Sequence, residues 1–173
     1  MANLRILGGR ARGRSLRVPE SARPSPVRLR KAVFDYLRGR YPDRGRFLDL
    51  YAGSGAVGLE AASEGFDVIM VENDPKAVRV LRENVRKLNL PARVIAADAS
   101  GFVRRAADRG ERYRIVFLDP PYDHDLGEAL TQVLDAGIVE PGGRVILQHP
   151  RELEIPFAER RVYGSSAVTI VEV

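Results

Sequence analysis

The sequence contains no cysteine. It can therefore form no disulfide, no thiolate zinc site and no cysteine nucleophile. It also has no apolar run long enough to span a membrane, and the arginine-rich stretch from Met1 to Arg17 lacks the apolar segment of a secretory signal. These absences predict a cytoplasmic protein without a membrane segment.

Acidic residues are scarce in the first quarter of the chain. Residues 1–46 contain thirteen Lys or Arg against Glu20, Asp35 and Asp43, a local net charge of +10. Because the whole chain of 173 residues carries +5, the remainder carries −5. A basic arm on a mildly acidic body indicates a polyanionic partner. A solvated, arginine-rich surface of the kind some thermostable proteins have is the alternative.

Arginine and glycine dominate the start of this basic segment. Two extended pieces, Leu4–Leu7 and Ser15–Val18, flank a glycine-rich turn, which predicts a small hairpin with exposed arginines. Guanidinium groups bind phosphate bidentately and can stack on bases. Arg10, Arg12 and Arg14 are therefore candidate RNA contacts.

A glycine-rich loop follows the next strand. After an apolar strand that contains Asp49, residues 52–60 include G-x-G-x-x-G and lead into an apolar-periodic helix. In this context the glycines let a ligand approach the backbone, and the helix N-terminus offers free N–H groups. The Asp49 carboxylate suits the cationic amino-acid part of S-adenosylmethionine and would repel a pyrophosphate, which favours that cofactor over a dinucleotide. The candidate contacts in this region are Asp49, Ala52, Gly53, Ser54 and Gly55.

The next two strands also lead to acidic residues. Glu72 ends the second strand, where an acid can accept hydrogen bonds from both hydroxyls of a ribose, and the neighbouring Asn73 is a further candidate cofactor contact. Asp98 follows the third strand and is a candidate to contact an adenine amine, while Ala99 leaves room for the ring. These acids extend the predicted cofactor site along one edge of the sheet.

A pair of prolines stops the fourth strand. Asp119-Pro120-Pro121-Tyr122 follows this apolar strand, at the edge where open α/β sheets bind ligands, although Asp-Pro-Pro alone also fits a plain turn. Asp119 and a carbonyl of the proline loop can accept hydrogen bonds from an amine on a planar heterocycle, and the ring can stack on Tyr122. The string resembles the [DNS]-P-P-[YFW] motif of S-adenosylmethionine-dependent methyltransferases that modify exocyclic or amide nitrogens. Its four residues are the candidate catalytic residues.

Strands and helices alternate along the chain. This order predicts an α/β fold with a Rossmann-like, doubly wound, mostly parallel sheet, a C-terminal antiparallel strand pair and an N-terminal basic hairpin. We expect residues 1–45 to form an RNA-binding hairpin and helix, and residues 46–173 to form the methyltransferase domain. The expected strands of the sheet are Phe47–Tyr51, Val68–Glu72, Ala92–Ala96, Tyr113–Leu118, Arg144–Gln148, Ile155–Tyr163 and Ala167–Val173. Besides the helix after the glycine loop, the expected helices are Val27–Leu37, one from Asn73-Asp74-Pro75 to about Leu88, Gly101–Arg109 and Leu126–Ile138.

Four stretches together carry a resemblance to a known family. They are Arg5–Gly9 with Arg12–Arg14; Arg23-Pro24 with Arg28, Arg30 and Phe34; Asp49–Glu60; and Asp119–Tyr122. Through them nearly the whole chain resembles the RsmD family of small-subunit ribosomal RNA guanine-N2 methyltransferases. The resemblance implies methyl transfer from S-adenosylmethionine to the exocyclic N2 of a guanine in 16S rRNA, presented on an assembling small ribosomal subunit. It adds Arg23, Arg28 and Arg30 to the candidate RNA contacts.

The chain departs from the family pattern at a few positions. Where the family usually has two hydroxyl residues, an acid and, a little later, a glutamate, this chain has Ser25, Pro26, Val27 and Lys31, and Gln148 stands where an acid is common. These departures concern RNA contact more than the chemistry. We expect a monomer that needs no metal.

Other functions fit part of the pattern. An N6-adenine methyltransferase acting on DNA or RNA would share the Asp119 motif, although the DNA enzymes usually add a target-recognition segment for which this chain has little room. An NAD-dependent oxidoreductase would share the glycine loop but leave the Asp119 motif unexplained. A non-catalytic RNA-binding assembly factor would need only the basic arm. His124 and His149 are isolated in the sequence, and Tyr51 and Phe34 fit packing better than base stacking.

Overall fold

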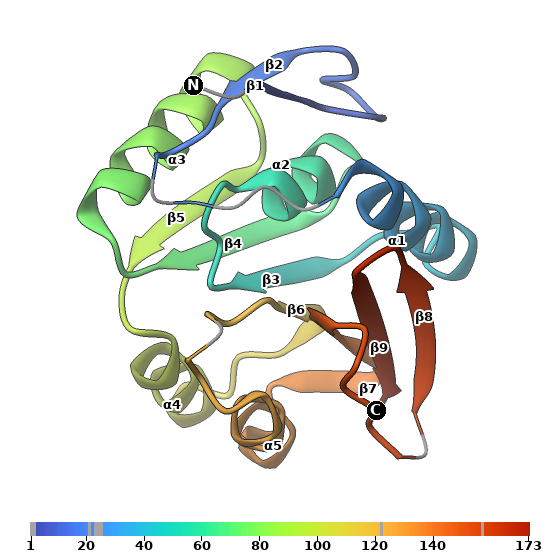
Figure 1. The fold of residues 1–173 in the computed structure, drawn as a ribbon. Helices are drawn as coiled ribbons and strands as arrows, with labels where there is room; N and C mark the ends of the chain where they lie inside the picture. The colour runs from blue at the N-terminus through green and yellow to red at the C-terminus, as the bar shows by residue number, and fades with distance from the viewer. Residues whose placement is uncertain (1–2, 21, 23–25, 122, 157) are drawn as a thin grey trace.

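The computed structural model of the chain describes residues 3–20, 22, 26–121, 123–156 and 158–173. Its main sheet has the strand order β5-β4-β3-β6-β7-β9-β8 (Figure 1). Neighbouring strands from β5 to β7 are parallel, whereas β9 is antiparallel to both β7 and β8. The strands are β3 (Arg46–Leu50), β4 (Asp67–Glu72), β5 (Ala92–Ala96), β6 (Tyr113–Leu118), β7 (Val139–Pro150), β8 (Glu159–Tyr163) and β9 (Ser166–Glu172). The predicted Rossmann-like sheet with its C-terminal antiparallel pair is confirmed.

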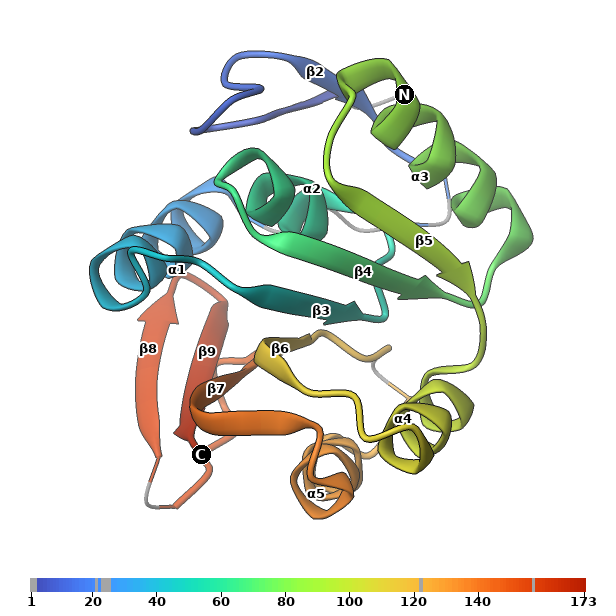
Figure 2. The ribbon, with the colours of Figure 1, turned by 180° about the vertical axis from the view of Figure 1, so that it is seen from behind.

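Both faces of the sheet are buried under helices, which explains why its central strands are apolar at successive positions. Phe47 and Phe117 face one core, and Leu48 and Leu118 face the other. The helices α1 (Val27–Arg40), α2 (Ala56–Ser63) and α3 (Pro75–Leu88) cover the first face. The helices α4 (Ala99–Asp108) and α5 (Leu126–Ala136) cover the second face (Figure 2).

The predicted N-terminal hairpin is also present. It consists of β1 (Asn3–Arg5) and β2 (Ser15–Arg17), which pair in antiparallel fashion. Its apolar side chains, among them Ile6 and Leu16, are buried in the same core as α1, α2 and α3. The buried Asn84 of α3 donates to the carbonyl of Arg17 at 2.8 Å and accepts from its N–H at 3.2 Å. The hairpin is therefore packed against the helical layer, and its register on α3 is specified by hydrogen bonds.

Most element boundaries match the prediction, and the differences have local causes. The helix expected to begin at Gly101 begins at Ala99, because the Asp98 side chain caps it by accepting the N–H of Gly101 at 3.1 Å. The helix expected to reach Ile138 ends at Ala136, because Gly137 takes a left-handed conformation with φ of 67°. β7 is longer than expected at both ends, because Val139 pairs with Tyr113 across a register shift and because His149 and Pro150 pair with β9.

The strand order determines where a ligand can bind. The chain winds outward from β3 in both directions, to β4 and β5 on one side and to β6 and β7 on the other. A crevice therefore opens beyond the carboxyl end of β3, between the loops that leave β3 and β6. In the described part of the chain, no helix combines the length and apolar character required to cross a membrane.

Candidate active site

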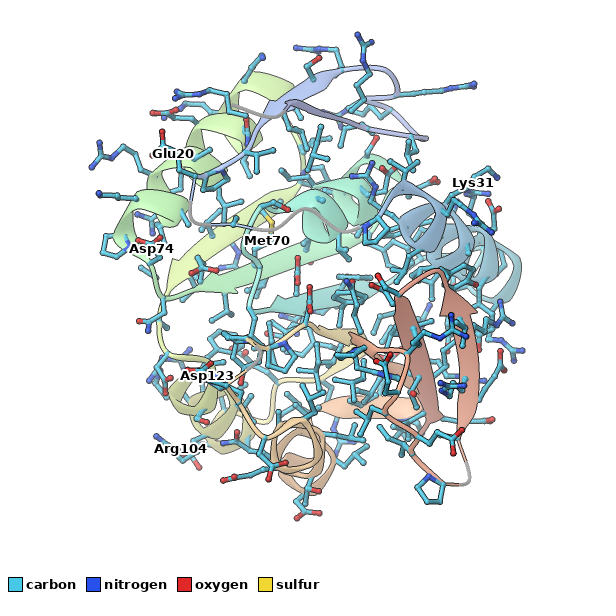
Figure 3. All side chains as sticks on the ribbon, in the orientation of Figure 1. Glu20, Lys31, Met70, Asp74, Arg104 and Asp123 are labelled. Atoms are coloured by element: carbon cyan, nitrogen blue, oxygen red, sulfur yellow. The ribbon has the colours of Figure 1, made fainter. Side chains whose placement is uncertain are left out.

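A pocket of about 450 Å³ lies at the carboxyl ends of β3, β4, β5 and β6. Eight of the nine predicted cofactor contacts line it, together with two of the four predicted catalytic residues. These are Asp49, Ala52, Gly53, Ser54, Glu72, Asn73, Asp98 and Ala99, with Asp119 and Pro121. Figure 3 shows Asp74 at the start of α3 and Asp123 in the loop after β6, at the same edge of the sheet. The tertiary structure thus brings together side chains that are spread over about seventy residues of sequence.

The glycine loop forms one wall of the pocket, and its glycines have different roles. Gly55 has φ of 78° and does not line the pocket; a Cβ there would lie 2.3 Å from a methyl group of Leu81, so this glycine allows α3 to pack closely. A Cβ on Gly58 would lie 2.5 Å from Met70 Cγ, so this glycine brings α2 onto β4. Gly53 has φ of 55°, and an added Cβ would be no closer than 3.8 Å to another atom, the Tyr51 carbonyl oxygen. Of these three glycines, only Gly53 would leave an added Cβ at ordinary van der Waals distance from its neighbours, and Gly53 lines the pocket.

Asp49 supplies a buried carboxylate at the base of this wall. Its side chain is 2% exposed, and its Oδ2 accepts the N–H of Gly58 at 3.0 Å. Burial raises the Asp49 pKa well above its usual range, and the nearby charges of Asp119 and Glu72 raise it further. Five carboxylates line this one pocket, those of Asp49, Glu72, Asp74, Asp98 and Asp119. A ligand that brings positive charge would relieve their repulsion, whereas a pyrophosphate would increase it.

Glu72 is held firmly at the end of β4. Its Oε1 accepts the N–H of Gly53 at 2.8 Å, and its Oε2 accepts the N–H groups of Asn73 at 3.0 Å and Asp74 at 2.9 Å. A carboxylate has about four lone-pair positions, so three are already used. One position remains for a ribose hydroxyl, so a second hydroxyl could bind Glu72 only by sharing or replacing one of these three bonds.

The wall opposite the glycine loop is built by small residues around Asp98. One Asp98 oxygen caps α4, and Ala97 and Ala99 line the pocket on either side of it. Methyl side chains take up little of the pocket there, in keeping with the prediction that Ala99 leaves room for a planar ring. The cap had not been predicted, and it explains why Asp98 has a well-defined orientation.

The predicted catalytic motif begins where β6 ends. Asp119 is half-buried in the pocket wall, and Pro120 is buried. The carbonyl of Pro121 accepts the backbone N–H of His124 at 3.0 Å, which closes the loop into a tight turn. Tyr122 lies outside the described residues. The carboxylate of the motif thus faces the same space as the glycine loop.

Two aromatic residues in the pocket wall were missed as site residues. The rings of Tyr51 and His124 meet edge to face, with centroids 5.6 Å apart, and both line the pocket. Tyr51 has φ of 61°, a left-handed conformation that is rare for a tyrosine. Tyr51 is half-buried and packs against the core on the second face of the sheet, as expected, and it also lines the pocket. The packing expectation also holds for Phe34, which is buried and stacks on Phe47 with centroids 6.2 Å apart. The sequence feature that could have identified Tyr51 as a site residue is its position next to the glycine loop.

The predicted RNA contacts do not all reach the surface. Arg10, Arg12, Arg14 and Arg28 are exposed, and Arg23 lies outside the described residues. Arg30 is 1% exposed, and its guanidinium donates to the carbonyl of Arg5 at 3.0 Å. The expectation that Arg30 contacts RNA is therefore wrong, because this side chain is enclosed between the hairpin and the helices. Among the described residues, no group of three or more His, Asp or Glu is arranged to hold a metal ion.

Comparison with known proteins gives consistent relatives. The family described as Conserved hypothetical protein 95 matches residues 4–171. Ribosomal RNA small subunit methyltransferase D of Escherichia coli (strain K12) is 38% identical over 136 residues, 76% of this chain and 67% of that protein. The solved structure of a hypothetical protein from Thermus thermophilus is 60% identical, with a TM-score of 0.95, and the match covers 98% of this chain and 99% of that one. The 16S rRNA N2 methyltransferase RsmC of T. thermophilus, solved with AdoMet and guanosine, is 23% identical with a TM-score of 0.74 over 99% of this chain and 49% of that chain, and shares the fold.

Proposed function

This chain belongs to the RsmD family, described as Conserved hypothetical protein 95, and on this premise we propose that it transfers a methyl group from S-adenosylmethionine to the exocyclic N2 of a guanine in 16S rRNA. The chain is an S-adenosylmethionine-dependent methyltransferase, and its substrate is RNA. The observation that carries the proposal is the presence of Asp119 in the wall of the pocket that also contains the glycine loop. One pocket then combines a hydrogen-bond acceptor for the target amine, Asp119, with the glycine loop that would bind the cofactor.

The residues around the pocket fit S-adenosylmethionine. Gly53 lines the pocket without a side chain, so it would let the amino-acid part approach the backbone closely. The buried Asp49 would balance its positive charge. Glu72 would hold the ribose, and the small residues beside Asp98 would hold the adenine. Bound in this way, the cofactor supplies an electrophilic methyl group on a sulfonium.

The proposed role of the Asp119 loop is to position the guanine amine. This amine is a weak nucleophile because its lone pair is delocalised into the ring. Hydrogen bonds from its two hydrogens to Asp119 and to the Pro120 carbonyl would favour a pyramidal nitrogen whose lone pair points into the pocket. Correct placement of reacting groups can lower a barrier by roughly 7–11 kcal/mol. Formation of the N–C bond would break the bond between the methyl carbon and the sulfonium sulfur, with S-adenosylhomocysteine as the leaving group. The nitrogen would then lose one proton to Asp119 or to solvent, so Asp119 need not be a strong base.

The target base must leave its stack to reach this loop, as enzymes that act on bases in helices require. We propose that Tyr122 stacks on the extruded base. The edge-to-face contact between Tyr51 and His124 joins the glycine loop to the Asp119 loop. This contact supports a fixed entrance to the pocket between the two loops.

The exposed arginines of the hairpin support an RNA-binding role for the N-terminal segment. We propose that residues 1–45 act as the RNA-binding extension and residues 46–173 as the methyltransferase domain. Ala22, which belongs to the extension, lines the pocket, so RNA held by the arm would be close to the reacting groups. The working form proposed is a monomer that acts in the cytoplasm on an assembling small ribosomal subunit.

The decisive experiment is methyl transfer from labelled S-adenosylmethionine to small-subunit rRNA, both naked and in particles that lack the modification, followed by nucleoside analysis. The proposal expects labelled N2-methylguanosine. Labelled N6-methyladenosine would keep the fold and the positioning mechanism but replace the substrate. The absence of label in every substrate, with S-adenosylhomocysteine binding intact, would overturn the proposal.

A further inference from the structure

Helix α3 has a strongly basic outer face. Its apolar residues, such as Val78 and Leu81, are buried against the sheet, and its exposed cations lie on the opposite side. All five cations are exposed: Lys76, Arg79, Arg82, Arg86 and Lys87. The guanidinium of Arg82 also donates to the carbonyl of Val94. The helix has one acidic residue, Glu83, which pairs with Arg17 of β2 at 3.2 Å. This concentration of charge is unexpected in the part of the chain that carries a net charge of −5.

The cations of α3 are regularly spaced. Successive members are three or four residues apart from Lys76 to Arg86, so each turn of about 5.4 Å presents one cation on the same face. The complete helix of 14 residues extends about 21 Å. The large apolar side chains that are exposed in the described part of the chain, Val27, Leu134, Val162 and Val173, all lie elsewhere. A regular row of charge without an apolar anchor matches a polyanion better than a protein surface.

This face is continuous with the hairpin at one end and with the pocket at the other. The Arg10 guanidinium donates to the carbonyl of Asn89, the residue that caps the C-terminus of α3. β2 runs along the helix through the Asn84 and Glu83 contacts, so the hairpin lies beside α3 (Figure 1). At the N-terminal end, Asp74 and Ala77 line the pocket. A strand of nucleic acid could therefore follow basic groups from the pocket mouth to the hairpin tip.

We propose that the outer face of α3 and the hairpin arginines form one phosphate-binding surface, which holds the RNA backbone that leads away from the methylated nucleotide. The inference rests on the proposed function, because it takes RNA as the occupant. It assigns to α3 a role that the sequence pattern did not indicate. Arginine and lysine on such a surface neutralise phosphates and release counterions, so each contact contributes to the salt dependence of binding.

The test compares two triple variants of the whole chain. Arg79→Gln, Arg86→Gln and Lys87→Gln together remove three cations from α3 and leave Arg82, which donates to the carbonyl of Val94 at 3.2 Å. Arg104→Gln, Arg105→Gln and Arg112→Gln remove three exposed cations from α4 and the loop after it. Helix α4, on which Figure 3 labels Arg104, covers the other face of the sheet. Glutamine has nearly the helix propensity of arginine and lysine, so both variants should fold.

RNA affinity is measured over a range of salt concentrations, with S-adenosylhomocysteine affinity and thermal unfolding as controls. We expect the α3 variant to lose at least about tenfold in affinity at low salt, and its salt slope to fall by roughly 2–3, about 0.7–0.9 for each lost contact. The α4 variant should bind as the wild type does. Equal losses in the two variants, or unchanged affinity and slope in the α3 variant, would overturn the inference. If the wild-type protein transfers no methyl group to RNA, the proposed function fails instead.

Discussion

Arg30 and Glu60 form an ion pair inside the protein, with Arg30 Nε 3.7 Å from Glu60 Oε1 and both side chains 1% exposed. Glu60 also accepts the N–H groups of Leu7 and Gly8, each at 2.9 Å. Within the described residues, Nε and Nη1 of Arg30 have no hydrogen-bond partner. Burial lowers the pKa of Arg30 and raises that of Glu60, and each charge opposes the shift of the other. This pair joins α1 and α2 to the end of β1 and to the start of the hairpin turn.

Arg30→Ala should therefore destabilise the protein strongly, because it leaves the Glu60 charge buried without its cation. Losing one partner of a buried pair typically costs about 3–5 kcal/mol. Lys31→Ala, at the next position of the same helix, breaks an exposed pair with Asp35 and should change stability by less than about 1 kcal/mol. Urea unfolding of both variants measures the difference. Equal effects would show that the Arg30 pair does not stabilise the fold.

Gly58→Ala should also destabilise the protein, since the added Cβ would lie 2.5 Å from Met70 Cγ and 2.9 Å from Asp49 Oδ2. Overpacking of this kind costs about 1–3 kcal/mol, and displacement of Asp49 should weaken cofactor binding as well. Gly39→Ala is the matched control, because that helical glycine has no atom within 4 Å of the added methyl. We expect a gain of about 0.5–1 kcal/mol for Gly39→Ala. Calorimetric unfolding and S-adenosylhomocysteine titration check both results; a stable, tightly binding Gly58→Ala protein would contradict the packing argument.

Asp49 should make the stability of the cofactor-free protein depend on pH. Its pKa is raised in the folded state, mainly by burial, so its contribution is complete below the ordinary aspartate pKa of about 3.9. As pH rises from there, the unfolded chain loses this proton first, and stability falls until the pH passes the folded-state pKa. Asp49→Asn keeps an oxygen for the Gly58 N–H but does not titrate. The unfolding free energy of the variant, minus that of the wild type, should increase as pH rises above about 4 and then level off. A difference that is constant or decreases with pH would refute this.

Asp119→Ala should abolish most methyl transfer while leaving S-adenosylhomocysteine affinity close to that of the wild type. The reason is that its proposed contacts are with the target amine, and loss of correct placement can cost at least about 10²-fold in rate. Asp123→Ala is the control, because its exposed side chain lies four residues further on and outside the pocket lining. Single-turnover rates with RNA and equilibrium titration with S-adenosylhomocysteine separate the two effects. Full activity of Asp119→Ala would remove the positioning mechanism.

The limits of sequence reasoning are visible at particular residues. Arg28 and Arg30 have the same residue type and lie two positions apart, yet one is exposed and the other is buried beside Glu60. Only the packing of the hairpin on α1 and α2 distinguishes them. Tyr51, at the end of an apolar strand, packs against the core as expected, but with its left-handed backbone it also lines the pocket, which the strand pattern did not indicate. The net charge of −5 after residue 46 did not indicate the basic face of α3, because that sum combines charges on surfaces that point in different directions.

The sequence alone determined the order of strands and helices, the glycine loop and the Asp119 motif, because these depend on local periodicity and on backbone conformations that few residues allow. It also placed the acids at strand ends, from which a parallel sheet necessarily brings them to one edge. Only the tertiary structure decided which charges remain in water. That outcome depends on contacts between segments far apart in the chain, such as Glu60 with Arg30 and Arg10 with Asn89, and no local pattern encodes them.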